Sequence, residues 1–198
     1  MRVSIDKVIE VLTLFVLSVV LIGCYNMELE SDQKLLIYAV GALGTPLKTR
    51  IKLQKLFFLV SNVFEDIGNA FRFEPHLFGP YSEILDETSE ELIDLDLIRK
   101  NKNKPFSLTT KGRDEYEKLS PMKELKDVID DFKGFLNDMS DDEIMTFIYT
   151  FYPNYISEST EWDRLKKKRM KIALDLLKKD KISFSKAVHL SGKKYREF

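Results

Sequence analysis

The stretch from Arg50 to Gly112 constrains the fold of this chain more than any other part of its 198 residues. Its apolar residues follow a helical period, then an extended one, then a helical one again, and a Gly-Pro pair at residues 79–80 breaks the pattern. This order is typical of a helix, a short strand, a second helix, a hairpin and a closing helix. A mainly α-helical fold with a small β hairpin is therefore expected.

The sequence also marks where these elements begin and end. Thr49 and Ser82 are placed to cap the N-termini of two helices, and the polar residues 101–104 suit the tip of a hairpin. In chain order, the expected elements are a helix at residues 32–43, a helix at 49–64, a strand at 71–74, a helix at 81–98, strands at 97–100 and 105–108, and a helix at 113–119. The pattern predicts a winged-helix domain at residues 28–120, with the hairpin as its β wing.

Four cations lie around the start of the helix at 49–64. Lys48, Arg50, Lys52 and Lys55 fall outside the apolar side of that helix and form a small basic patch. Because charged residues usually occupy the solvent-facing side of a helix, we expect all four to be solvated.

The remaining residues, 121–198, predict a helical and basic C-terminal region. Helical periodicity covers residues 121–136 and 141–152, and Ser140 with Glu143 forms a capping-box pattern. Residues 28–159 carry 16 Lys and Arg against 25 Asp and Glu, whereas residues 160–198 carry 13 against 5. A basic segment on an acidic body suits contact with a phosphate backbone, with anionic lipid or with the acidic body of another copy in a homo-oligomer.

Few residues in the chain suit catalysis or metal binding. Cys24 is the single cysteine, and the two histidines, His76 and His189, have no cysteine partners for a zinc site, so we expect them to be packed or surface residues. The sequence contains no glycine-rich phosphate loop, nucleophile elbow or zinc-protease motif. We expect no enzyme activity, no catalytic residue, no metal and no cofactor.

The first 27 residues form a separate hydrophobic segment with four interpretations. The uncharged run reaches from residue 11 to residue 25, and to residue 8 if one glutamate is accepted. It is short for a membrane span, so a membrane anchor at residues 8–25, a lipoprotein signal ending at Cys24, a start misplaced ahead of Met27 and a buried helix all stay open. The chain is expected in the cytoplasm, or on the cytoplasmic face of the membrane if the segment is an anchor.

Three motifs in the body carry a family resemblance. The runs KLQKLFFLV, FRFEPHLFGPYSEIL and FSLTTKG resemble the YwgA-like family of predicted winged-helix regulators and, more distantly, the Panacea (SocA-like) antitoxin domain. The resemblance covers residues 32–118. It implies a DNA-binding-like fold with a regulatory or antitoxin-like role, and it supplies no catalytic residues.

A second resemblance lies at the C-terminal end. The run KISFSKAVHLSGKKYREF is similar to the short helix-turn-helix of small antitoxins of the UPF0175 type. Ser183 or Ser185 would cap its first helix, Ala187 would allow close packing and Gly192 would make the turn. The chain stops at Phe198, inside what would be the second helix.

The helix at 81–98 carries seven carboxylates and, before Arg99, no basic residue. In a helix-turn-helix module the helix in this place normally enters the major groove, where phosphates would repel such a face. The alternative is that this helix binds a basic protein partner. The expected partner-binding residues are Glu83, Asp86, Glu87, Glu90, Glu91 and Asp94.

DNA binding by other parts of the domain is the competing hypothesis. The wing, its flanks and the basic tail would then contact phosphates, which gives affinity with little sequence selectivity. The expected nucleic-acid-binding residues are Arg99, Lys100, Lys102, Lys104, Lys111, Arg113, Lys193 and Lys194. The expected functions are thus a DNA-binding transcriptional regulator, an antitoxin-like partner-binding module or a membrane-tethered adaptor.

Overall fold

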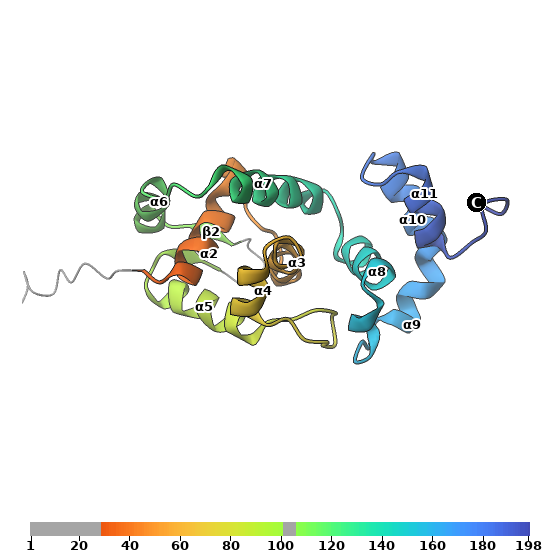
Figure 1. Cartoon of the computed structure of the whole chain (residues 1–198), viewed down its shortest axis with the longest axis horizontal. Coiled ribbons are helices and arrows are strands. Elements are labelled where there is room, and N and C mark those ends of the chain that lie inside the picture. Colours follow the sequence, from red (N-terminus) through yellow and green to blue (C-terminus); the bar gives the residue numbers. More distant parts are fainter. Residues whose placement is uncertain (1–28, 101–105) are drawn as a thin grey trace, which may run out of the picture. The chain divides into compact units, whose positions relative to one another are not determined.

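A computed structural model describes residues 29–100 and 106–198 of the chain (Figure 1). The hydrophobic N-terminal segment and the predicted wing tip, with Lys102 and Lys104, lie outside the described residues. In the part of the chain that is described, no helix has the length and apolar character that crossing a membrane requires.

The fold is mainly helical, with a small two-stranded antiparallel sheet. Its α-helices are α2 (Ser31–Gly41), α3 (Arg50–Ser61), α4 (Glu65–Phe71), α5 (Glu83–Asp94), α6 (Thr110–Glu117), α7 (Lys123–Asn137), α8 (Asp141–Phe151), α9 (Trp162–Leu165), α10 (Arg169–Lys178) and α11 (Phe184–Ser191). Short 3-10 turns lie at Ala42–Gly44, Pro153–Ile156 and Lys166–Lys168.

Helix α3 lies at the centre of the helical packing. It contacts α4, α7 and α8, and every residue from Lys52 to Val60 is buried. A helix that is buried all round must satisfy its charged side chains internally, because water cannot reach them. The polar side chains of the KLQK sequence, residues 52–55, therefore need hydrogen-bond partners inside the protein.

Helix α2 packs on α5, α6 and the sheet, and it places Leu36 and Ile37 in the core. Strand β1 (Ile98–Arg99) pairs antiparallel with β2 (Ser107–Leu108), with Ile98 opposite Leu108. The residue before β2, Phe106, forms a further bridge to Leu47 and donates its backbone N–H to the Leu47 carbonyl at 2.8 Å. The predicted hairpin strands are therefore present, although each is only two residues long.

The expected N-terminal caps are confirmed. The side-chain oxygens of Thr49, Ser82 and Ser140 accept backbone hydrogen bonds at the starts of α3, α5 and α8. The Glu143 side chain also accepts from the backbone N–H of Ser140, which completes the capping box. These motifs are local, so the sequence alone could identify them.

The predicted strand at residues 71–74 is wrong in its first half. Phe71 is the last residue of α4, a helix that the sequence pattern did not indicate. Glu65 and Asp66 favour its N-terminus by interacting with the helix dipole, while Gly68 within it obscures the helical pattern. Extended pairing is limited to Glu74, which exchanges two backbone hydrogen bonds of 2.9 Å with Tyr81.

In the C-terminal region, α10 and α11 pack together and both contact α8. Ser183 caps α11, Ala187 is fully buried in it, and Gly192 ends it in the left-handed conformation. No helix follows within residues 193–198. The helix expected after Ser183 is thus present as α11, and the turn expected at Gly192 follows it.

Candidate functional site

The KLQK segment, Lys52 to Lys55, is a buried structural element. Lys52 and Gln54 are each 3% exposed and Lys55 is 2% exposed, so the expectation that the two lysines are solvated is wrong. The reason is the packing of α3 against α4, α7 and α8, which covers the side that the sequence pattern assigns to solvent. Each polar side chain of the segment instead meets a backbone group from another part of the chain.

Gln54 joins α3 to the start of α5. Its Nε2 donates to the Ser82 carbonyl at 2.9 Å, and its Oε1 accepts from the Ser82 backbone N–H at 2.9 Å. The Ser82 hydroxyl in turn accepts from the Leu85 N–H and donates to the Phe71 carbonyl. All of these groups are buried, so Gln54 satisfies two backbone groups that would otherwise lack partners.

Lys55 holds the Gly-Pro turn in the same way. Its Nζ donates to the Pro80 carbonyl at 2.7 Å, and burial lowers the pKa of this amine to about 7. Gly79 takes a left-handed φ of 81°, and an added Cβ would lie 3.1 Å from the Tyr149 ring and 3.6 Å from Lys55 Nζ. The KLQK segment thus binds the FGPYS segment, residues 78–82, through the hydrogen bonds of Gln54 and Lys55.

Two further lysines bind the carbonyl ends of helices. Lys52 Nζ donates to Asn137 O at 2.8 Å, at the end of α7, and burial lowers its pKa. Lys133 Nζ donates to the carbonyls of Ala39, Val40 and Ala42 at 2.6–2.9 Å, and burial lowers its pKa to about 8. A cation at the C-terminus of a helix is favourable because unpaired carbonyls and the helix dipole meet there.

The outer side of α5 forms the candidate functional surface. Glu83, Glu87, Glu90 and Asp94 follow one another at helical spacing and are all exposed, and we call these four the acidic stripe. Within the described part of the chain, Glu83, Glu87 and Asp94 make no ion pair or side-chain hydrogen bond. Glu90 lies 3.8 Å from both Arg50 and Lys100. The stripe therefore presents mostly unneutralised negative charge.

The other two predicted partner-binding residues differ from the stripe. Asp86 is partly buried, forms an ion pair with Arg50 and accepts from the Tyr81 hydroxyl at 2.9 Å. Glu91 is exposed and accepts from Gln33 Nε2 at 3.1 Å. Asp86 is consequently a structural contact between α3 and α5, and Glu91 lies beside the stripe.

The predicted nucleic-acid-binding residues that the structure describes lie on several elements: β1 and its end, α6 and the segment after α11. Arg99 is exposed on β1, whereas Lys100 lies over the Phe106 ring and Lys111 Nζ donates to the Leu95 carbonyl at 3.1 Å. Arg113 is exposed on α6. Lys193 and Lys194 follow α11, whose principal contacts are with α10 and α8 and not with the sheet.

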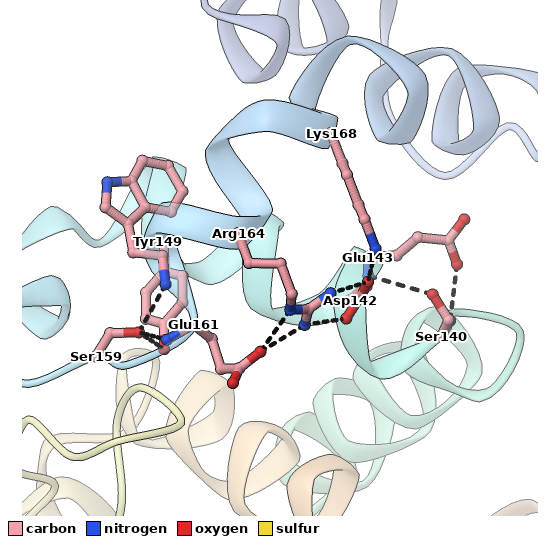
Figure 2. A network of polar contacts seen from close by, with 9 residues as sticks. Ser140, Asp142, Glu143, Tyr149, Ser159, Glu161, Arg164 and Lys168 are labelled. Carbon is pink, nitrogen blue, oxygen red and sulfur yellow. Dashed lines mark hydrogen bonds and ion pairs between the residues drawn. The ribbon is translucent and has the colours of Figure 1, made fainter.

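Part of the basic C-terminal region is paired with carboxylates of the same chain, and Figure 2 shows the contacts of Arg164 and Lys168. Arg164 makes two hydrogen bonds of 2.7 Å to the Asp142 carboxylate and a further one to Glu161, and Lys168 reaches Asp142 at 3.2 Å. The hydrogen bond from Arg164 holds the pKa of Asp142 at about 2. Lys179 contacts both carboxylate oxygens of Glu143 at 2.8 Å. The acidic N-terminus of α8 thus binds cations of the basic tail, which the sequence suggested for contact with DNA phosphates.

A second polar contact in Figure 2 fixes the bend after α8. Ser159 Oγ donates to the Tyr149 hydroxyl at 2.7 Å and accepts from the backbone N–H groups of Glu161 and Trp162. Tyr149 is buried, and Trp162 packs edge-on against it. The side chains of Tyr149, Ser159 and Trp162 therefore pack together at this bend.

In the described ranges no group of three or more His, Cys, Asp or Glu side chains is placed to hold a metal ion. No protein-family model matches the chain, and a search of curated proteins finds no match for it.

Proposed function

We propose that this protein is a regulator of the winged-helix type that acts by binding a basic protein partner through the acidic stripe on α5. The observation that carries this proposal is the run of exposed carboxylates, of which Glu83, Glu87 and Asp94 have no partner among the described residues. Unpaired charges of one sign along a rigid helix favour a ligand of the opposite sign and speed its association. An antitoxin-like or adaptor role fits such a surface.

The same helix disfavours the usual mode of DNA reading. In a helix-turn-helix module, α5 would occupy the place of the recognition helix, and its carboxylates would meet the phosphates that line the groove. The lysines of the KLQK segment are buried, and three cations of residues 160–198 bind carboxylates of α8. Fewer free cations remain for phosphate contacts than the sequence suggested.

The proposal is tested by comparing what tagged full-length variants capture from the native cell. The stripe variant carries Glu83→Gln, Glu87→Gln and Asp94→Asn. The control removes three exposed carboxylates elsewhere through Asp114→Asn, Glu124→Gln and Asp127→Asn. We expect the wild type and the control to retain a basic protein that the stripe variant loses, and we expect the purified partner to bind again without other components.

Titration of the protein with duplex DNA tests the competing hypothesis of DNA binding. At about 50 mM salt, contacts to phosphates should produce strong binding that falls steeply as salt rises. Saturable, salt-dependent duplex binding, together with equal partner capture by the wild type and the stripe variant, would contradict the proposal and favour a DNA-binding regulator.

A further inference from the structure

A cavity of about 240 Å³ lies between the start of α3 and the turn formed by residues 76–81. Its lining includes Arg50, Ile51, Lys55, Phe78 and Tyr81. A cavity of roughly 150 Å³ is sufficient to hold benzene, so this one has room for a single ring and a small polar group. It lies next to the buried contact of Lys55 with Pro80, and the proposed partner binding does not involve it.

Lys55 brings an incompletely satisfied amine to this cavity. Its charged form has three N–H donors, and its one hydrogen bond within the described residues goes to the Pro80 carbonyl. It forms no ion pair with any residue that the structure describes. A buried lysine in this state is unfavourable in the empty protein, and an anion beside it would remove part of that cost.

Arg50 supplies a second donor at the same cavity. Its terminal nitrogen pairs with Asp86, whereas its Nε is buried and has no hydrogen-bond partner. The cavity is thus lined by two basic side chains that each have unused hydrogen-bond donors among the described residues.

The remaining walls are largely apolar. Ile51 and the Tyr81 ring, on which the His76 ring stacks with centroids 4.6 Å apart, form part of the lining. Phe78 belongs to the same lining and is 43% exposed, so it lies where the cavity meets solvent. Mostly apolar walls with a few convergent polar groups are typical of small-molecule sites.

We propose that this cavity binds a small carboxylate with an apolar body of about one ring in size. The carboxylate would accept hydrogen bonds from Lys55 Nζ and from the Arg50 guanidinium group, and the apolar body would pack against Ile51, Phe78 and Tyr81. Charge-assisted hydrogen bonds to a carboxylate are stronger than those between neutral groups, and a bound carboxylate also favours the charged form of Lys55.

Arg50 also gives the ligand a route to α5. A bound carboxylate competes with Asp86 for the guanidinium group, and it thereby leaves an additional unpaired carboxylate next to the acidic stripe. In this way occupancy of the cavity would change the affinity of the partner surface. This coupling rests on the proposed function, whereas ligand binding itself does not.

The binding test uses the full-length protein without any partner, so its result is independent of the proposed function. Phenylacetate and hexanoate are titrated separately and followed by amide chemical shifts, with phenylacetamide as the uncharged analogue. We expect saturable shifts at residues 50–55 and 76–81 for at least one carboxylate, and binding of phenylacetamide at least about tenfold weaker, because a charge-assisted hydrogen bond is lost.

Two variants separate a specific site from general attraction of anions. Arg50→Gln should weaken carboxylate binding at least about tenfold, whereas Arg99→Gln, which removes an exposed arginine outside the cavity lining, should leave it unchanged. Thermal unfolding of both variants establishes that they are folded. The proposal is overturned if neither carboxylate saturates, or if folded Arg50→Gln binds as the wild type does.

Discussion

Gln54 shows what a single buried side chain does in this fold. Replacing it by Leu keeps much of its volume but leaves the N–H and carbonyl of Ser82 without partners. We expect the free energy of unfolding to fall by about 2–6 kcal/mol, since each of the two unsatisfied buried groups costs about 1–3 kcal/mol. Urea unfolding measures this loss. Gln33→Leu, which removes an exposed hydrogen bond to Glu91, should cost less than about 1 kcal/mol.

Lys55 makes stability depend on pH. Its pKa is about 7 in the folded protein and about 10.4 in an unfolded chain, so between these values the unfolded state binds a proton that the folded state has released. Its contribution to the free energy of unfolding therefore rises with pH, at close to 1 kcal/mol per unit between about pH 7 and about pH 9.

The control for this prediction is Lys55→Met, which keeps an apolar stem and cannot titrate. The difference in unfolding free energy between wild type and variant, measured by urea unfolding across the pH range, should shift in favour of the wild type as pH rises. A difference that does not change with pH would mean that Lys55 is charged in the folded state throughout.

Gly112 is required where α6 passes close to β1. An added Cβ would lie 1.9 Å from the Leu97 carbonyl oxygen, which is backbone and cannot move aside easily. We expect Gly112→Ala to lower the free energy of unfolding by about 3 kcal/mol or more. Gly134→Ala in α7 is the matched substitution. The atom nearest to the added Cβ would be a side-chain atom of Leu43 at 3.9 Å, so this substitution should stabilise the helix by up to about 1 kcal/mol.

At the scale of elements, α8 is joined to α9 by the Asp142–Arg164 pair. The pKa of Asp142 is lowered to about 2, so its contribution to stability is complete above about pH 4, where the unfolded carboxylate is also ionised, and is lost as pH falls toward 2. Asp142→Asn should lower the unfolding free energy by about 1 kcal/mol at neutral pH, a modest value because the pair is partly exposed to solvent.

The acid-unfolding transition, followed by circular dichroism, tests this element. Asp142→Asn should unfold at higher pH than the wild type when pH is lowered. Asp163→Asn is the control because Asp163 pairs only with its neighbour Lys166 in the same segment and is largely exposed. Equal transitions in wild type and Asp142→Asn would show that the pair does not hold α8 to α9.

Features that depend on residues close in sequence could be predicted, whereas contacts between distant segments could not. The caps at Thr49, Ser82 and Ser140 depend on residues three positions apart, so they could be read directly. Lys55 and Lys133 could not be assigned, because the carbonyls that they bind lie 25 and more than 90 residues away in the chain. Only the packing of α3 and α7 reveals that these lysines are buried.

For the candidate surface, the sequence predicted the acidic character of α5, because charge does not depend on packing. It could not predict that Asp86 is committed to Arg50 or that Asp142 binds two cations, since those pairs join separate elements. The cavity beneath the Gly-Pro turn was also beyond sequence reasoning, because it is formed by two segments that meet only in the fold.

At the scale of the whole molecule, some C-terminal cations pair with carboxylates of the same chain, whereas Glu83, Glu87 and Asp94 of α5 have no partner among the described residues. Arg164, Lys168 and Lys179 bind carboxylates of α8, and Arg164 also binds Glu161, which directly precedes α9. The stripe on α5 has no comparable set of internal partners among the described residues. This difference is the basis for assigning partner binding to the acidic surface and not to the basic tail.

The most direct test of this assignment is the affinity of the purified partner for the wild type and for the variant with Glu83→Gln, Glu87→Gln and Asp94→Asn, measured by calorimetry at about 50 mM and about 300 mM salt. We predict an affinity loss of at least about tenfold in the variant at low salt and a weaker dependence on salt than in the wild type. Equal affinities and equal salt dependence for the two proteins would contradict the account.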